Sequence, residues 1–222
     1  MTTASEQDHN PYDICTWRPI SECADCSLKI RLNCRFKKED LLHFMAMFWG
    51  FAIPAIIGVI RAGYGWWLLG WFAFAMFFFN VWESRILCSH CPYYAEKGST
   101  LHCIANYGSV KPWKYRPGPM SRAEKAQLWI GFVILTGFPF PFLLLGRQWA
   151  LAFIALWGLI LFFWTLNKYT CSQCVNFSCP LNRAPKEVVD AYLQRNPTMS
   201  KAWEASGWQP ELPLTHPEVK GK

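Results

Sequence analysis

Charged residues are missing from four long stretches of this chain. The stretches cover residues 41–60, 66–82, 126–146 and 149–167, which are 20, 17, 21 and 19 residues long. A helix needs about 20 apolar residues to cross the hydrocarbon core of a bilayer, and about 17 is the lower limit. Four uncharged helices of this length would leave a water-soluble protein with too little polar surface. We therefore expect an all-α membrane protein with four transmembrane helices.

Several membrane functions require residues that these stretches lack. With no Asp, Glu, Lys or Arg inside the stretches, a proton or ion pathway through the bundle is not expected. A haem with two axial histidines is not expected either, because His43, near the start of the first stretch, is the only histidine in any of them. The first 40 residues lack the apolar core of a secretory signal. The chain also has no arginine-rich run, so binding to nucleic acid is not expected.

Short turns at 61–65 and 147–148 join the stretches into two tandem hairpins. Of the 22 Lys and Arg residues, only Arg61 and Arg147 lie on the side of these turns, which leaves 20 on the other side. All 15 acidic residues also lie on that other side, so its formal charge is 20 − 15 = +5. Because positive residues mark the cytoplasmic side, we expect an integral protein of the cytoplasmic (inner) membrane with both termini in the cytoplasm. The excess charge suits anionic lipid headgroups of the bilayer.

The expected organisation has five parts. They are a cytoplasmic cysteine-rich arm (1–40), a first transmembrane hairpin (41–82), a cytoplasmic cysteine-containing loop (83–125), a second hairpin (126–167) and a cytoplasmic cysteine-containing tail (168–222) with a short amphipathic helix at 185–195.

Three local signals refine this organisation. Ser121 and Glu124 have the spacing of a capping box at the start of the third stretch. Pro139 and Pro141 predict a kink in its outer third. In the tail, Pro185 suits the first turn of the amphipathic helix.

Ten cysteines lie on the expected cytoplasmic side, where thiols stay reduced and such patterns bind metal more often than they form disulfides. Four thiolates in the arm complete either a tetrahedral zinc site or a four-cysteine iron–sulfur cluster. The loop and the tail each supply three more thiols. The candidate ligands are Cys15, Cys23, Cys26 and Cys34 in the arm, Cys88, Cys91 and Cys103 in the loop, and Cys171, Cys174 and Cys179 in the tail.

A repeated exit from the membrane predicts that the loop and tail cysteines share one region. Phe79 precedes Cys88 by nine residues and Phe163 precedes Cys171 by eight, so Cys-Ser-His-Cys and Cys-Ser-Gln-Cys follow two spans at matching depth. Six thiolates on one face are expected to pool. His90 and His102 would add further donors, and His102, which adjoins Cys103, is the better candidate ligand.

Iron–sulfur chemistry is favoured over zinc by two details. Cys91-Pro92 and Cys179-Pro180 have the cysteine–proline pair that ends bacterial ferredoxin runs, and no Cys-x2-Cys pair is followed by the glycine of a zinc knuckle. Several metal sites at a membrane face would form an electron relay between a membrane- or quinone-linked partner and a soluble redox enzyme. A zinc-braced anchor or scaffold subunit without redox activity is the alternative, and a thiol oxidoreductase is a third. In the first two cases the chain is a non-catalytic subunit whose partners are the bilayer and a redox protein or larger membrane complex.

The cysteine–proline pairs after the second and fourth stretches resemble those of the four-span ferredoxin-type membrane proteins of nitrate respiration. This resemblance implies electron transfer from quinol through cysteine motifs at the cytoplasmic face. The chain has C-x2-CP and C-x2-C-x4-CP where that family has C-x3-CP and a full ferredoxin tail, so no residue roles are carried over. The Cys88, Cys91 and His102-Cys103 pattern is also similar to the zinc loop of protein palmitoyltransferases. The Asp-His-His-Cys motif of that family is absent, so acyl transfer is not expected.

Overall fold

The computed structural model describes residues 10–211, and regular structure in this range is helical apart from one isolated bridge between Thr100 and Val110. The π-helical turns are η3 and η6, and the other η elements are 3₁₀ turns. In chain order the elements are η1 (Cys15–Trp17), η2 (Ile20–Cys23), α2 (Lys38–Arg61), α3 (Trp67–Phe77), η3 (Phe78–Trp82), α4 (Glu83–Ile86), η4 (Cys88–His90), η5 (Pro92–Ala95), α5 (Arg122–Gly137), α6 (Pro139–Leu145), α7 (Trp149–Thr165), η6 (Leu166–Thr170), η7 (Cys171–Gln173), α8 (Lys186–Gln194) and α9 (Pro197–Glu204).

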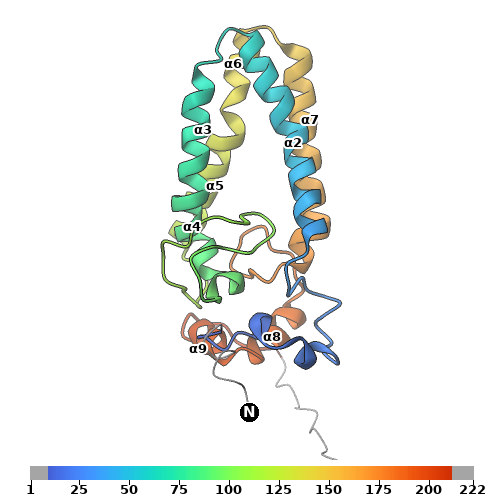
Figure 1. The fold of residues 1–222 in the computed structure, drawn as a ribbon, viewed down its shortest axis with the longest axis vertical. Helices are drawn as coiled ribbons and strands as arrows, with labels where there is room; N and C mark the ends of the chain where they lie inside the picture. The colour runs from blue at the N-terminus through green and yellow to red at the C-terminus, as the bar shows by residue number, and fades with distance from the viewer. Residues whose placement is uncertain (1–9, 212–222) are drawn as a thin grey trace, which may run out of the picture.

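The long helices form an elongated bundle above a compact base (Figure 1). Three helical segments, Lys38–Arg61, Arg122–Leu145 and Trp149–Gln173, are long and apolar enough to cross a membrane. They contain the first and fourth of the expected stretches and nearly all of the third. The remaining stretch, 66–82, is helical as α3 and η3 but is not one of these three segments.

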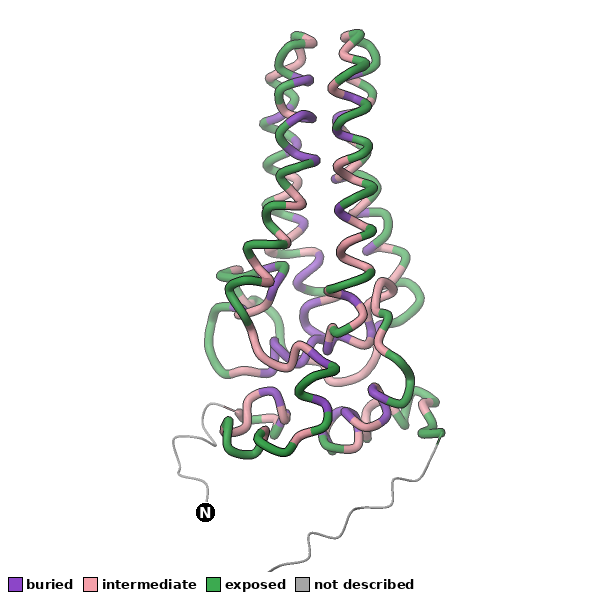
Figure 2. The backbone as a smooth tube through the Cα atoms, turned by 90° about the vertical axis from the view of Figure 1, so that its right-hand side faces the viewer, coloured by how far each residue is buried: buried purple, intermediate pink, exposed green. Residues whose placement is uncertain are grey.

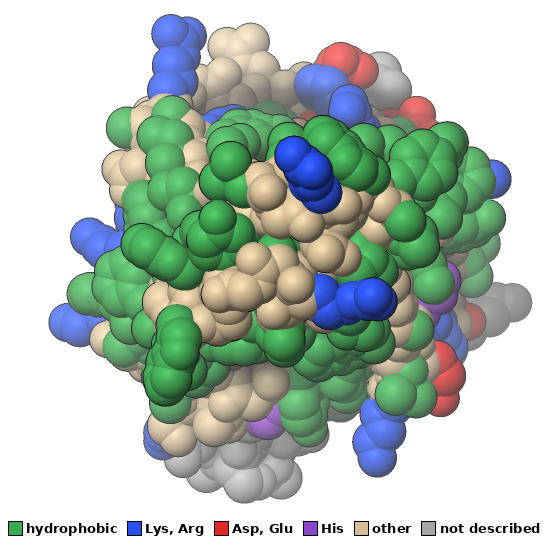
Figure 3. Space-filling view, turned by 90° about the horizontal axis from the view of Figure 1, so that it is seen from above, with side chains coloured by type: hydrophobic (Ala, Val, Ile, Leu, Met, Phe, Trp, Pro, Cys, Tyr) green, Lys and Arg blue, Asp and Glu red, His purple; other side chains and the backbone are tan. Residues whose placement is uncertain are grey.

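Apolar side chains cover the outside of the bundle. Ile53, Leu69, Val133 and Ile154 are each at least half exposed, and exposed backbone alternates with buried backbone along the helices (Figure 2). Seen from above, the end of the bundle is mostly hydrophobic and carries few basic side chains (Figure 3). An outer surface of this kind is suited to contact with lipid.

Close packing between α2 and α7 depends on glycine. A Cβ atom on Gly158 would lie only 2.5 Å from the carbonyl oxygen of Gly50, so the two backbones touch at this point. Small residues that let backbones approach closely are typical of helix contacts in membranes. On the other side of the bundle, a Cβ on Gly131 would collide with the ring of Phe78 at 1.9 Å.

The two predictions about the third span are confirmed. The Oγ of Ser121 accepts a hydrogen bond from the backbone N–H of Glu124 at 3.2 Å, and the carboxylate of Glu124 accepts one from the N–H of Ser121 at 2.8 Å. Helix α5 ends at Gly137 and α6 begins at Pro139, while Phe138 between them keeps a helical conformation. The prolines therefore interrupt the span as a kink rather than as a loop.

The tail contains the expected amphipathic helix and a second helix that the sequence analysis did not predict. Helix α8 lies inside the predicted range 185–195 and buries Val188, Tyr192 and Leu193. The unpredicted helix is α9, which buries Met199.

The base consists of residues 10–37, 83–121 and 171–211, and we call it the cysteine-rich base. It lies at the lower end of the bundle, where the arm, the loop and the tail meet (Figure 1). All three segments contribute to one hydrophobic core, which includes Ile14, Leu28, Leu101, Tyr115, Val188 and Tyr192. The arm and the tail therefore fold together with the loop rather than as separate appendages.

Candidate metal centre

All ten cysteines lie in the cysteine-rich base, and all are free thiols. They fall into two groups by position. The arm set is Cys15, Cys23, Cys26 and Cys34, and the pooled set is Cys88, Cys91, Cys103, Cys171, Cys174 and Cys179.

The two helical segments that lead to the pooled set have similar local structure. Each Cys-x2-Cys pair begins with a 3₁₀ turn, and a π-helical turn lies before it, directly before Cys171 and one short helix, α4, before Cys88. The second cysteines have nearly equal backbone angles, φ −81° and ψ 137° for Cys91 and φ −77° and ψ 132° for Cys174. The hydroxyls of Ser89 and Ser172 donate to the carbonyl oxygen four residues earlier, at 2.6 and 2.8 Å. The repeat in the sequence is thus also a repeat in structure.

The loop and tail segments that carry the pooled set are in contact, because the side-chain nitrogen of Asn176 donates to the carbonyl oxygen of Leu87 at 3.3 Å. Burial raises the pKa of the Cys91 thiol, and repulsion from Cys174, Cys103 and Cys179 raises it further. Burial likewise raises the pKa of Cys179 to about 12, with added repulsion from Cys174 and Cys171. The fold therefore brings thiols from two hairpins into one region.

A buried acid and a buried amide complete this region, and the sequence analysis missed both. The side-chain amide of Asn106 donates to the carboxylate of Glu83 at 2.9 Å and to the sulfur of Cys88 at 3.3 Å. The backbone N–H of Asn106 donates to the sulfur of Cys103 at 3.2 Å. Burial raises the pKa of Glu83 to about 7. The only sequence signal for Glu83 is its position directly after an uncharged stretch.

The four cysteines of the arm set line one cavity of about 580 Å³. A guanidinium nitrogen of Arg195 donates to the sulfur of Cys26 at 2.9 Å, and one of Arg35 lies 3.8 Å from the sulfur of Cys23. The charged lining is mostly basic and consists of Arg18, Lys29, Arg35, Lys37, Arg195 and a single acid, Glu22. The positive field of these side chains favours an anionic occupant.

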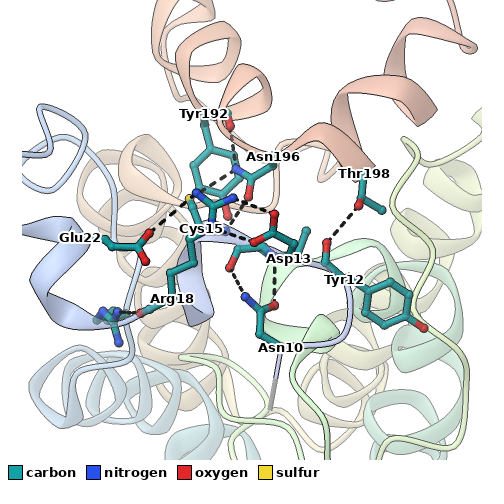
Figure 4. A network of polar contacts seen from close by, with 11 residues as sticks. Asn10, Tyr12, Asp13, Cys15, Arg18, Glu22, Tyr192, Asn196 and Thr198 are labelled. Atoms are coloured by element: carbon teal, nitrogen blue, oxygen red, sulfur yellow. Dashed lines mark hydrogen bonds and ion pairs between the residues drawn. The ribbon is translucent and has the colours of Figure 1, made fainter. Parts of the chain in front are cut away.

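The tail holds the arm in place through Asn196, which is fully buried (Figure 4). Its side-chain oxygen accepts the backbone N–H of Cys15 at 2.6 Å, and its side-chain nitrogen lies 3.3 Å from the Cys15 sulfur and 2.6 Å from the carbonyl oxygen of Tyr192. The Tyr192 hydroxyl shares a hydrogen bond of 2.7 Å with the hydroxyl of Thr16. The arm set therefore takes its ligands from the arm and part of its polar surroundings from the tail.

The two histidines of the loop have partners outside the cysteine sets. The Nδ1 of His102 lies 2.8 Å from a carboxylate oxygen of Glu96, so only its Nε2 is available as a ligand. The Nδ1 of His90 lies 2.6 Å from the carbonyl oxygen of Gly118, and its Nε2 lies 3.5 Å from a carboxylate oxygen of Glu124. His90 therefore faces the start of α5.

Within residues 10–211, no three Cys, His, Asp or Glu side chains form a group that would hold a metal ion. N–H donors nevertheless lie against many of the cysteine sulfurs. Such donors stabilise thiolates and tune the potentials of sulfur-ligated clusters. The sulfurs with a side-chain or backbone N–H neighbour are those of Cys15, Cys23, Cys26, Cys88, Cys103 and Cys174. The donor set thus fits an anionic group bound through sulfur.

Direct thiol chemistry fits the Cys-x2-Cys pairs of the loop and the tail poorly. Burial raises the pKa of Cys88 and of Cys91 well above the ordinary value of a thiol, and it raises the pKa of Cys171 to about 12. Reactive cysteines need a lowered pKa and access to solvent, because the thiolate is the nucleophile. The surroundings of these two pairs therefore argue against their use in thiol–disulfide exchange.

No protein-family model, curated protein or solved structure matches this chain.

Proposed function

We propose that this chain is an integral membrane iron–sulfur protein that relays electrons between a membrane- or quinone-linked partner and a soluble redox enzyme. The arm set would hold one cluster, and the pooled set would supply ligands for further metal. The ligands expected from the sequence remain the ten cysteines, with His102 as an additional donor.

The observation that carries this proposal is the arm cavity. Four cysteines line it together with five basic side chains and one acidic side chain, and two guanidinium groups approach the sulfurs. A cluster ligated by four thiolates is an anion, so this field stabilises it. N–H donors at the ligand sulfurs also tune its reduction potential.

A cluster is favoured over zinc by the two cysteine–proline pairs, Cys91-Pro92 and Cys179-Pro180, because such a pair ends the cysteine runs of bacterial ferredoxins.

The proposal includes a fourth span, made by α3 and η3, and a cytoplasmic base. The helical run from Trp67 to Trp82 contains no charged residue and stands alongside α5 (Figure 1). If it crosses the bilayer, the arm, loop and tail share one side, and the basic residues of the base support a cytoplasmic position for that side. A fluorescent protein fused after Gly98 should then be fluorescent, because it would fold in the cytoplasm, and an alkaline phosphatase fused at the same site should be inactive. An active phosphatase there would show that this span or the orientation is wrong.

The function itself is tested by measuring iron, acid-labile sulfide and zinc per chain in protein purified anaerobically in detergent. Electron paramagnetic resonance (EPR) spectra are recorded before and after reduction. Iron with matching sulfide and a signal that changes on reduction is the expected result. Zinc without a redox signal would instead support the zinc-braced membrane anchor. If the protein contained neither iron nor zinc and all ten thiols reacted freely with a thiol label, both functions would be falsified.

A further inference from the structure

The arm set and the pooled set are joined through the backbone of one residue, Asn33. Its N–H donates to the carbonyl oxygen of Gln173 at 2.7 Å, and its own carbonyl oxygen accepts the hydroxyl of Tyr93 at 2.7 Å. Asn33 directly precedes Cys34, and Gln173 directly precedes Cys174. A path from Cys34 to Cys174 therefore runs through the backbone of Asn33 and Gln173 and crosses a single hydrogen bond.

Tyr93 provides a second connection. Its side chain is only 4% exposed, and it follows Cys91 by two residues. Tyr93 and Cys91 belong to the buried core of the base, and Cys103 of the pooled set and Cys34 of the arm set pack against this core. Tyr93 therefore shares one packed core with cysteines of both sets.

Trp17 of the arm fixes the position of this segment. Its indole N–H donates to the carbonyl oxygen of Pro92 at 2.9 Å, and its ring meets the ring of Tyr93 edge to face, with centroids 6.1 Å apart. An aromatic pair in a buried, hydrogen-bonded setting has a fixed geometry. The space between the two sets is therefore filled by ordered protein.

We propose that the arm set and the pooled set act as a coupled electron-transfer pair, bridged by Asn33 and Tyr93. This inference rests on the proposed function, because it requires a redox-active metal group in each set. With such a group in each set, Asn33 and Tyr93 would give a single electron a bonded path from the reduced group to the oxidised one, and no proton or bond would be exchanged. Electron tunnelling is faster through covalent and hydrogen bonds than through empty space, which is why the bridge matters.

Coupling is tested on the full-length chain, reduced anaerobically in detergent, by EPR spectra and their power saturation. Cys23→Ser removes a ligand of the arm set and Cys91→Ser a ligand of the pooled set, so each variant isolates one signal. The fully reduced native protein should show spin–spin broadening and faster relaxation that both variants lose. A native spectrum equal to the sum of the two variant spectra would overturn the inference.

Metal analysis of the same samples separates the two ways of failing. If the protein holds no iron and no sulfide, the proposed function fails and the inference fails with it. If iron and sulfide are present in both sets while the spectra simply add, only the inference is wrong.

The bridge is tested by the rate at which electrons redistribute after flash reduction. Tyr93→Phe deletes the hydroxyl that bonds to Asn33 and keeps the ring. Tyr115→Phe is the matched control, because Tyr115 is also buried near Cys91 but its hydroxyl has no hydrogen-bond partner among the described residues. We expect slower redistribution only in Tyr93→Phe, at unchanged iron content. Equal rates in both variants, or loss of iron from Tyr93→Phe, would overturn the role of Tyr93.

Discussion

Replacing Arg195 by alanine should make the reduction potential of the arm site more negative. Its guanidinium donates to the sulfur of Cys26 at 2.9 Å, so it places positive charge against a ligand of the proposed cluster. Reduction adds one negative charge to the site, and a nearby cation stabilises the reduced state more than the oxidised state. Removing the cation therefore disfavours reduction.

The size of the shift follows from the strength of this contact. A hydrogen bond to a charged group contributes about 1.5–3 kcal/mol. Arg195 is exposed to solvent, and screening limits an exposed charge pair to about 1 kcal/mol. Since about 1.4 kcal/mol corresponds to 59 mV for one electron, Arg195→Ala should lower the midpoint potential by about 40 mV.

A redox titration followed by EPR measures this potential. Arg31→Ala is the control, because Arg31 is also an exposed arginine of the base, although it belongs to the arm and pairs with Glu187 of the tail instead of a cysteine. The control should titrate like the native protein. An unchanged or higher potential in Arg195→Ala, or an equal fall in Arg31→Ala, would refute the electrostatic reasoning.

Three further predictions concern packing and assembly. Gly158→Ala forces a methyl group to 2.5 Å from the Gly50 carbonyl oxygen, so it should destabilise the protein by about 1–3 kcal/mol and lower its Tm in detergent. Gly70→Ala is the control and should keep the native Tm, because a Cβ at Gly70 would have nothing within 4 Å. Cys23→Ser should remove the iron of the arm set and leave that of the pooled set, as measured by iron per chain; loss of all iron would contradict two separate sites. Asn196→Ala leaves buried partners of the arm unsatisfied and should cost about 1–3 kcal/mol, and a native Tm would show that the tail does not hold the arm.

The membrane helices were predictable because their signal is local. Absence of charge over a whole span needs no knowledge of the partner helix, and the predicted stretches match α2, α5–α6 and α7 closely. The capping box at Ser121 and the break before Pro139 were also predictable, since each depends on residues within one helical turn. The π-helical turns at the two exits had no recognisable pattern in the sequence.

Contacts within the base could not be predicted in the same way. Asn196 and Cys15 are 181 residues apart, and an asparagine in a tail carries no sign of its partner. Helix α9 has only eight residues and one fully buried side chain, too few for a periodic pattern. Asn106 is one polar residue among many in a loop, yet it links Glu83, Cys88 and Cys103. Such residues become visible only when the fold brings distant segments together.

The origin of each cysteine set would link the proposed metal binding to assembly of the bundle. Cys91 follows the first hairpin and Cys174 follows the second, in nearly the same backbone conformation, so neither hairpin alone supplies the pooled set. The arm set needs a different partner, the tail, which contributes Arg195 and Asn196. On the proposed function, a buried thiol would lose its proton only when a cation is there to bind, so metal binding and the docking of these segments would stabilise each other. On the proposed function, a cluster in the pooled set therefore reports that the two hairpins have packed together, and a cluster in the arm set reports that the tail has closed over the arm.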